Sequence, residues 1–263
     1  MSKYTVEKLV GDLYALGVEQ GDILLVHSGF RNINAASPLA VIEALEKAVG
    51  EAGTIVMPSF PGGSEFLMVQ GGMVFDVRSR KTDCGVIPET FRKLPGVKRS
   101  LSAGHSMAAR GRLRDELLAG HEKCRVSAGW GSPFEKIIAR RGKILLIGTG
   151  NEHNTTLHYV ENTHGAPTVC GMEFYPSVID ENGRRILVPT LPHMPGLPRR
   201  YGEVDAELLD AGLQKDGLFG DAEAHLIDAW GMNKLIGGKV EKDRCYLIRK
   251  FDLKNYPAAA NIN

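Results

Sequence analysis

One stretch of the sequence brings a base and a carboxylate to a strand-to-helix junction. The apolar run 143–147 is followed by glycines and then by Asn154, a residue type that caps helices. On that helix His158 and Glu161 are three residues apart and share one face, so the carboxylate can fix the orientation and tautomer of the imidazole. A general base is built in this way. A structural core histidine beside an unrelated surface glutamate gives the same spacing, and the spacing does not choose between the two.

The elements before this stretch alternate between strands and helices. Residues 22–27 and 54–57 are continuous apolar runs, typical of strands that are buried on both faces of a sheet. An amphipathic helix is expected over residues 5–16, and Ser37 followed by Pro38 is a typical start of a second helix. We therefore predict an α/β fold with a mixed, largely parallel central sheet flanked by helices.

Two loops leave this sheet at the same edge. Ser28, Gly29 and Phe30 follow the first strand, and Ser59 follows the second. In open α/β sheets, ligands bind beyond the carboxyl ends of the strands, so these loops are candidate walls of one cleft. His27 lies at the rim, where a structural hydrogen bond explains it as well as a functional role does.

Six segments of the chain resemble one enzyme family. Residues 154–161 (NTTLHYVE) are similar to the N-T-[TS]-L-H-x-x-E segment of the aminoglycoside N3-acetyltransferases, the antibiotic N-acetyltransferases that do not have the GNAT fold. Five further segments resemble that family in the same order, and the match runs from about residue 9 to residue 167. They are residues 26–31 (VHSGFR), 53–60 (GTIVMPSF), 85–89 (GVIPE), 105–111 (HSMAARG) and 131–136 (GSPFEK).

The resemblance implies a reaction and a site. It implies direct acetyl transfer from acetyl coenzyme A to the 3-amino group of the 2-deoxystreptamine ring of an aminoglycoside, with His158 as general base and Glu161 as its partner. Should His158 not be the base, His27 or His105 would take its place. No metal is expected. The residues predicted to bind the coenzyme are Ser28, Gly29, Phe30, Ser59, His105, Ser106 and Met107.

The charged stretch between residues 62 and 83 has little periodicity and is expected to be a mobile loop. Its basic residues Arg78, Arg80 and Lys81 suit either a solvated surface or contacts to the coenzyme A phosphates. Ser132 and Glu135 have the spacing of a capping box, which predicts a helix that leads into the strand at residue 143.

The last third of the chain gives other patterns. Residues 168–191 are predicted to form a hairpin, and the proline-rich residues 189–201 an exposed loop. Helices are expected over residues 204–215 and 222–235, and a last strand over residues 245–248. These elements form a C-terminal α+β part packed on the same domain.

The chain is predicted to be a single acetyltransferase domain over residues 1–263. Residues 1–167 would form the coenzyme A and catalytic core, and residues 168–263 an acceptor-side extension. An aminoglycoside is a polycation and favours a pocket lined with carboxylates, but residues 189–216, where the acceptor would bind, are the least like the family and include two arginines. The candidate carboxylates are Asp76, Glu89, Glu161, Glu173, Glu203 and Asp205.

Three alternative functions stay open. The chain could acetylate a different amine from acetyl coenzyme A, or bind coenzyme A without catalysis. It could also be a metal-dependent amidohydrolase, although its histidines lack the H-x-H or H-x-x-x-H spacing of such sites. The histidines in question are His27, His105, His153, His158, His164 and His193.

Composition excludes several other classes. The 263 residues are 43% hydrophobic and 24% charged with a net charge of +1, which favours neither nucleic acid nor a membrane surface as a partner. No apolar stretch approaches the ~18 residues of a transmembrane helix, and a secretion signal is lacking. The four cysteines are far apart, which suits reduced thiols. We expect a cytoplasmic enzyme whose partner is a small-molecule amine, as a single chain or a homodimer.

Overall fold

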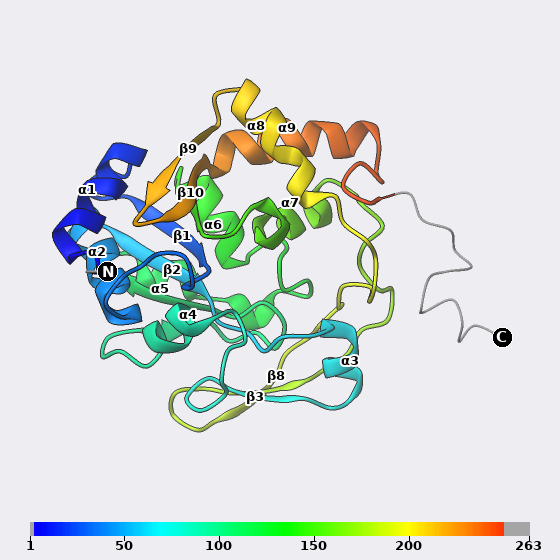
Figure 1. The fold of residues 1–263 in the computed structure, drawn as a ribbon. Helices are drawn as coiled ribbons and strands as arrows, with labels where there is room; N and C mark the ends of the chain where they lie inside the picture. The colour runs from blue at the N-terminus through cyan, green and yellow to red at the C-terminus, as the bar shows by residue number, and fades with distance from the viewer. Residues whose placement is uncertain (1–2, 250–263) are drawn as a thin grey trace.

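The computed structural model describes residues 3–249, which fold around a seven-stranded sheet of order β4-β5-β2-β1-β6-β10-β9 (Figure 1). At its centre β2 (Thr54–Pro58), β1 (Ile23–Ser28) and β6 (Lys143–Ile147) run parallel. The outer strands pair antiparallel: β5 (Met107–Gly111) and β4 (Lys98–Arg99) on one side, β10 (Ala222–Asp228) and β9 (Gln214–Phe219) on the other. The predicted mixed α/β sheet with a parallel centre is confirmed.

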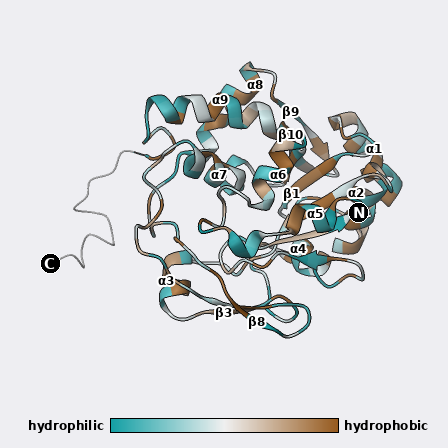
Figure 2. Cartoon of the chain, turned by 180° about the vertical axis from the view of Figure 1, so that it is seen from behind, coloured by the Kyte–Doolittle hydropathy of each residue, from teal (hydrophilic) through white to brown (hydrophobic). Residues whose placement is uncertain are grey.

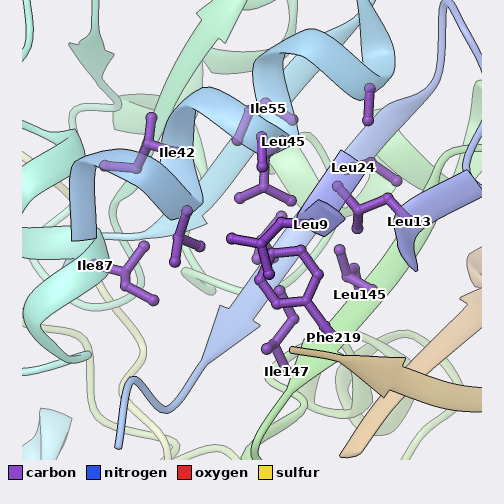
Figure 3. Packing of buried hydrophobic residues seen from close by; sticks show 14 of the residues in the cluster. Leu9, Leu13, Leu24, Ile42, Leu45, Ile55, Ile87, Leu145, Ile147 and Phe219 are labelled. Atoms are coloured by element: carbon purple, nitrogen blue, oxygen red, sulfur yellow. The ribbon is translucent and has the colours of Figure 1, made fainter. Parts of the chain in front are cut away.

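Alternate residues of the parallel strands pack on opposite faces, as the period of two requires. On one face Leu24, Ile55 and Leu145 pack against the helices α1 (Val6–Leu16), α2 (Pro38–Val49) and α4 (Val86–Phe91) (Figure 3). On the other face Leu25 and Ile144 pack against the helices α5 (Arg114–Leu118), α6 (Pro133–Ala139), α7 (Thr156–Thr163), α8 (Asp205–Asp210) and α9 (Ala229–Lys242). Hydropathy follows this layering, since β1 is mostly hydrophobic while α1 and α9 mix both kinds of residue (Figure 2).

The predicted helix ends are largely confirmed. The Thr5 hydroxyl accepts a hydrogen bond from the Lys8 amide, Gly17 ends α1 with φ +111°, and Ser37 caps α2 before Pro38. The helix α6 begins at the predicted place, but neither hydrogen bond of the capping box is formed. Ser132 is the N-cap residue without a side-chain bond, while the Glu135 carboxylate accepts from the Gly131 amide.

The segment from residue 62 to residue 83 is not the loop that its charge pattern suggested. It contains α3 (Glu65–Gln70) and β3 (Val74–Asp76), and β3 pairs with β7 (Ser177–Ile179) and β8 (Arg185–Leu187) in a second, three-stranded sheet. Figure 1 shows α3, β3 and β8 together at the opposite end of the molecule from α8 and α9. Phe75 and Val178 form the core of this sheet.

Two predictions for the last third were wrong. Of the helices expected over residues 204–215 and 222–235, α8 and α9 form at residues 205–210 and 229–242, but residues 214–219 and 222–228 form the β9-β10 hairpin on the edge of the central sheet. Pairing of β10 with β6 overrides the helix propensity of the alanine, glutamate and leucine residues there. Residues 245–248 contribute only an isolated bridge between Ile248 and Arg199. The hairpin at β7 and β8 is confirmed. None of the helices within residues 3–249 is long and apolar enough to cross a membrane.

Candidate active site

Two cavities meet at the carboxyl-terminal edge of the parallel strands. The first encloses about 560 Å³ and is bounded by the residues that end β1, β2 and β6, including Ser28, Pro58 and Gly148. The second encloses about 230 Å³ and lies between α3 and the loop after β8, where His193 and Arg199 line it. Phe60 and His158 line both cavities. A group bound in one cavity can therefore react with a group bound in the other only beside these two side chains.

Two glycines allow the loops after β1 and β6 to approach each other closely, just before the segment that carries His158. Gly29 and Gly148 follow β1 and β6, and a Cβ atom on either would come within 3.0 Å of the other's carbonyl oxygen (2.9 and 2.8 Å). The chain then turns through a short 3-10 helix, and the Asn154 side-chain oxygen accepts a hydrogen bond from the Thr156 amide at the start of α7. His158 follows on the first turn of α7, where its side chain is 22% exposed.

His158 is held from behind by a carboxylate and a phenol. Its Nδ1 lies 3.4 Å from Glu161 Oε2 and 2.9 Å from the Tyr201 hydroxyl oxygen. The Tyr201 hydroxyl donates to Glu161 Oε2 at 2.6 Å, and Arg199 Nε donates to Glu161 Oε1 at 2.9 Å. Since the only Tyr201 proton goes to Glu161, the Tyr201 oxygen accepts from His158 Nδ1–H. The unprotonated nitrogen of the neutral ring is therefore Nε2.

Burial is the main cause that lowers the pKa of His158 and favours its neutral form. Burial lowers the pKa of His158, and the neighbouring His193 lowers it further, against the opposing effect of Glu161. Burial alone would raise the pKa of Glu161, but the bonds from His158, Arg199 and Tyr201 outweigh it, so that this pKa is lowered and the fully buried carboxylate stays charged. The pair thus consists of a neutral base and an anion that stabilises its protonated form.

A second network of the same design lies across the second cavity. Ser127 Oγ donates to Glu65 Oε1 at 2.6 Å and lies 2.7 Å from His105 Nδ1. Glu65 Oε2 accepts from the backbone amide of His193 at 2.9 Å and from its Nδ1 at 2.6 Å. Three donors thus surround a carboxylate that is only 6% exposed. They lower the pKa of Glu65 although burial would raise it.

The protons of this network can be assigned in the same way. Asn162 Nδ2 donates to the Ala128 carbonyl, and its Oδ1 accepts from Thr168, which fixes the orientation of the amide. The same Nδ2 lies 2.9 Å from His193 Nε2, so this nitrogen accepts and the His193 proton is on Nδ1. Because the Ser127 proton goes to Glu65, His105 Nδ1–H must donate to Ser127, which leaves the lone pair of His105 on Nε2.

Glu65, His105 and His193 also satisfy the ligand count of a metal site. One ligand atom from each lies within 4.8 Å of the other two, and all three residues are buried. Zinc would bind the lone pairs of histidine nitrogens. In this arrangement both Nδ1 atoms carry protons that are used in hydrogen bonds, so the three side chains form a hydrogen-bonded network as they stand.

The residues predicted to bind the coenzyme are dispersed. Ser28 and Gly29 line the first cavity and His105 the second, while Phe30 packs against the hydrophobic core. Ser59, Ser106 and Met107 are fully buried and line neither cavity. Arg78, Arg80 and Lys81 also lie outside both linings, and Arg78 forms an ion pair with Asp76.

The predicted acceptor carboxylates are not gathered around the second cavity. Asp76, Glu89, Glu173 and Glu203 form ion pairs with nearby arginines or lysines, and Asp205 lines a separate cavity. Glu161 lies behind His158, bonded to Arg199. The carboxylate that lines the second cavity is Glu65, which the sequence analysis did not single out.

Tyr201, Arg199 and Ser127 also belong to the site, although they were not predicted from the sequence. Tyr201 and Arg199 lie at the end of the segment that was expected to be an exposed loop, yet Tyr201 is 4% exposed. That expectation was wrong because His193, Tyr201 and Thr190 turn inward. A signal was present in the run of a histidine, two arginines and a tyrosine among prolines, which is unusual for a plain linker.

One thiol is also near the reaction centre. Cys84 lines the first cavity, and burial raises its pKa, so it is protonated at neutral pH and is a poor nucleophile.

Comparison with known proteins places this architecture among acetyltransferases. Residues 25–236 match the family model described as aminoglycoside 3-N-acetyltransferase. The chain is 34% identical to aminoglycoside N(3)-acetyltransferase IV of Salmonella sp over 228 residues, which cover 84% of this chain and 81% of the relative. It is 27% identical to aminoglycoside N(3)-acetyltransferase III of Serratia marcescens, over 68% of this chain and 72% of the relative.

Solved structures show the same fold. The crystal structure of the aminoglycoside acetyltransferase AAC(3)-IVa apoenzyme superposes with a TM-score of 0.81 at 29% identity, covering 98% of this chain and 96% of that one. A variant of the same enzyme, in which one histidine is replaced by alanine, is known in complex with a gentamicin (TM-score 0.81, 29% identity, 95% and 93% coverage). A binary complex of AAC-IIIb with CoASH superposes with a TM-score of 0.79 at 28% identity, covering 92% and 97%.

Proposed function

Because the chain belongs to the aminoglycoside 3-N-acetyltransferase family, we propose that it transfers the acetyl group of acetyl coenzyme A to the 3-amino group of an aminoglycoside, with His158 as general base. The observation that carries this proposal is that His158 lines both cavities, while its bond to Tyr201 leaves the lone pair of the ring on Nε2. Residues 1–167 supply most of the first cavity, and the loop after β8 completes the second.

Acetyl coenzyme A is assigned to the first cavity. This cavity lies beyond the carboxyl ends of the parallel strands, where backbone N–H groups can meet a ligand. Its lining includes His27 and Ser28, which have side-chain polar atoms without a hydrogen-bond partner among residues 3–249. The AAC-IIIb relative binds CoASH, and the AAC(3)-IVa relative binds a gentamicin and apramycin. The aminoglycoside is accordingly assigned to the second cavity.

The reaction requires two protons to leave the acceptor nitrogen. The ammonium form first loses one proton to solvent. The amine then attacks the thioester carbonyl, a C–N bond forms, the C–S bond breaks, and His158 Nε2 takes the second proton and passes it to the leaving thiolate. Glu161 stabilises the imidazolium that exists between these two transfers, and Tyr201 fixes the ring orientation.

Replacing His158 tests the proposal directly. His158→Ala should lower kcat by about 10²–10⁴, the usual contribution of a general base, while the affinity for coenzyme A measured by calorimetry stays nearly the same. His164→Ala is the matched control, since His164 ends the same helix and lines neither cavity. Full activity in His158→Ala would remove the base from this mechanism.

One observation favours a second candidate, an acetyltransferase for a different amine. Among residues 3–249, Glu65 is the single carboxylate that lines the second cavity, and it already accepts from three donors, whereas a polycation favours several free carboxylates. A panel of aminoglycosides and simple amines, assayed by release of the free coenzyme A thiol, decides between the candidates. If every 2-deoxystreptamine compound is inert while another amine is acetylated, the acceptor assignment changes.

A further inference from the structure

His105 carries a lone pair that the reaction described above does not use. Its Nδ1 is committed to Ser127, and its Nε2 has no hydrogen-bond partner within the part of the chain that the structure describes. His105 lines the second cavity together with His158, and the centroids of the two rings are 5.3 Å apart. Of the three imidazoles that line the second cavity, that of His193 already accepts from Asn162 at Nε2. The other two, His105 and His158, have an Nε2 lone pair without a partner among residues 3–249.

We propose that His105 is a second amine-binding residue, which accepts a hydrogen bond from the attacking nitrogen and restricts the enzyme to primary amines. The proposal rests on the proposed function, since it places the acceptor nitrogen between His105 and His158. Each N–H···N bond is about 2.9 Å long, so two acceptors of one nitrogen lie about 5 Å apart. The ring centroids of His105 and His158 are 5.3 Å apart, so the two rings are close enough for both to contact one nitrogen bound between them.

The number of N–H bonds on the nucleophile decides the selectivity. A neutral primary amine has two, and can donate one to His105 and one to His158 while its lone pair points at the thioester carbonyl. A secondary amine or a hydroxyl has only one such bond and must leave one imidazole without a donor. Two fixed acceptors thus select against both of these nucleophiles, and they also orient the lone pair of a primary amine.

Glu65 and Ser127 are positioning residues in this arrangement. They hold the proton of His105 on Nδ1, because Ser127 has already given its own proton to Glu65. His193 and the His193 amide hold Glu65 from the other side. Behind them the buried His121 lies 2.7 Å from the Ser127 carbonyl oxygen and donates to it. Without this chain of bonds His105 could carry its proton on Nε2 and would then repel a donor.

The first test is a measurement on the unmodified protein. Long-range ¹H–¹⁵N spectra of the imidazoles should show His105 protonated at Nδ1 and unprotonated at Nε2, and titration with gentamicin should shift the Nε2 signal. A His105 ring protonated at Nε2, or an Nε2 signal that stays unchanged at saturating gentamicin, overturns the proposal. If the signal shifts but no coenzyme A thiol is released, the amine-binding role of His105 stands and the proposed reaction fails.

The second test is kinetic. His105→Phe keeps a ring of similar size and removes the acceptor, so KM for gentamicin should rise about 10- to 100-fold, as expected for the loss of one hydrogen bond to a charged or polarised group, while KM for acetyl coenzyme A stays the same. His105→Gln, whose amide oxygen can take the place of Nε2, should restore part of the difference. His164→Gln serves as the control for replacement of a histidine.

Selectivity gives the sharpest outcome. The unmodified enzyme should prefer a primary amine over the corresponding N-methyl amine, and His105→Phe should reduce this preference. If His105→Phe raises KM for gentamicin and KM for acetyl coenzyme A equally, or leaves the preference for the primary amine unchanged, His105 only supports the fold. The spectra decide the question independently if His105→Phe does not fold.

Discussion

The two sides of the acceptor cavity use the same sequence of groups, a carboxylate, a hydroxyl and an imidazole. On one side Glu161, Tyr201 and His158 follow one another, and on the other Glu65, Ser127 and His105. The two networks differ in what else binds the carboxylate. Arg199 pairs with Glu161, whereas His193 pairs with Glu65. They also differ in position, since His158 lines both cavities and His105 only the second.

The difference in position suits His158 and His105 to different roles. A base must reach both the amine and the leaving thiolate, and of these two histidines only His158 borders the cavities proposed for both substrates. Burial lowers the pKa of His105 well below its ordinary value, and the nearby His193, His158 and His121 lower it further against the opposing effect of Glu65. A poor base can still accept a hydrogen bond. His105 is thus suited to orient the amine, and His158 to deprotonate it.

The substitution expected to separate the two networks most strongly is Glu161→Gln, through its effect on kcat. Without the carboxylate the imidazolium of His158 loses its stabilising anion, so kcat should fall by about 10-fold or more, though less than in His158→Ala. The acidic limb of the kcat/KM profile should move to lower pH, because Glu161 raises the pKa of His158 and its charge is now absent.

Glu161→Gln and His158→Ala should not be additive, because the two residues act as one unit. Combining them should cost little more than His158→Ala alone, and a fully additive loss would separate Glu161 from the base. Thermal unfolding of each variant controls for stability, because Glu161→Gln leaves Arg199 without its buried, charged partner.

Arg199→Met should move the same limb in the opposite direction. Arg199 lowers the pKa of His158, so its removal should raise that pKa and shift the acidic limb of kcat/KM to higher pH. The methionine keeps much of the apolar stem of the side chain. Arg125→Met is the matched control, because Arg125 is paired with Glu173 and lines neither cavity. A shift to lower pH would contradict the assignment of charges around His158.

The same two networks show what the sequence could and could not predict. His158 and Glu161 are three residues apart, so helix geometry alone brings them together. Glu65 and His193 are 128 residues apart, and Ser127 is 62 residues from Glu65, so only the completed fold brings them together. No local pattern indicates such pairs.

Prediction of the fold likewise succeeded where the signal is local and failed where it depends on residues far apart in the sequence. Strands buried on both faces, the ends of α1 and α2 and the β7-β8 hairpin have local signals and were predicted correctly. The β9-β10 hairpin was not, since its residues have helix propensity and become strands only by pairing with β6. The inward turn of the proline-rich loop was missed because it depends on the partners of His193 and Tyr201, which lie far away in the sequence.

Acid should destabilise the fold through the buried histidines that support the second network. Burial lowers the pKa of His121 to about 4, so between pH ~6.5 and about 4 the unfolded chain binds a proton that the folded chain does not. Stability should therefore fall as pH falls through this window, by up to ~1.4 kcal/mol per pH unit for each such residue. Urea unfolding of the unmodified protein and of His121→Gln measures this, and the variant should show the shallower slope. Equal slopes would show that His121 is not kept neutral by the fold.

Removal of metal ions should have the smallest effect, and it tests how the second network is bonded. Both Nδ1 atoms of the Glu65, His105 and His193 cluster carry protons in the hydrogen-bonded arrangement. Zinc bound at these two atoms would displace both protons and open the 2.6 Å contact between His193 and Glu65. Prolonged dialysis against a chelator should therefore leave kcat and the unfolding temperature unchanged, and elemental analysis of the purified protein should find less than one zinc per chain. Loss of activity that zinc alone restores would instead make the cluster a metal centre. It would then favour the metal-dependent reaction left open by the sequence, because the two histidines would have no lone pair left to orient an amine.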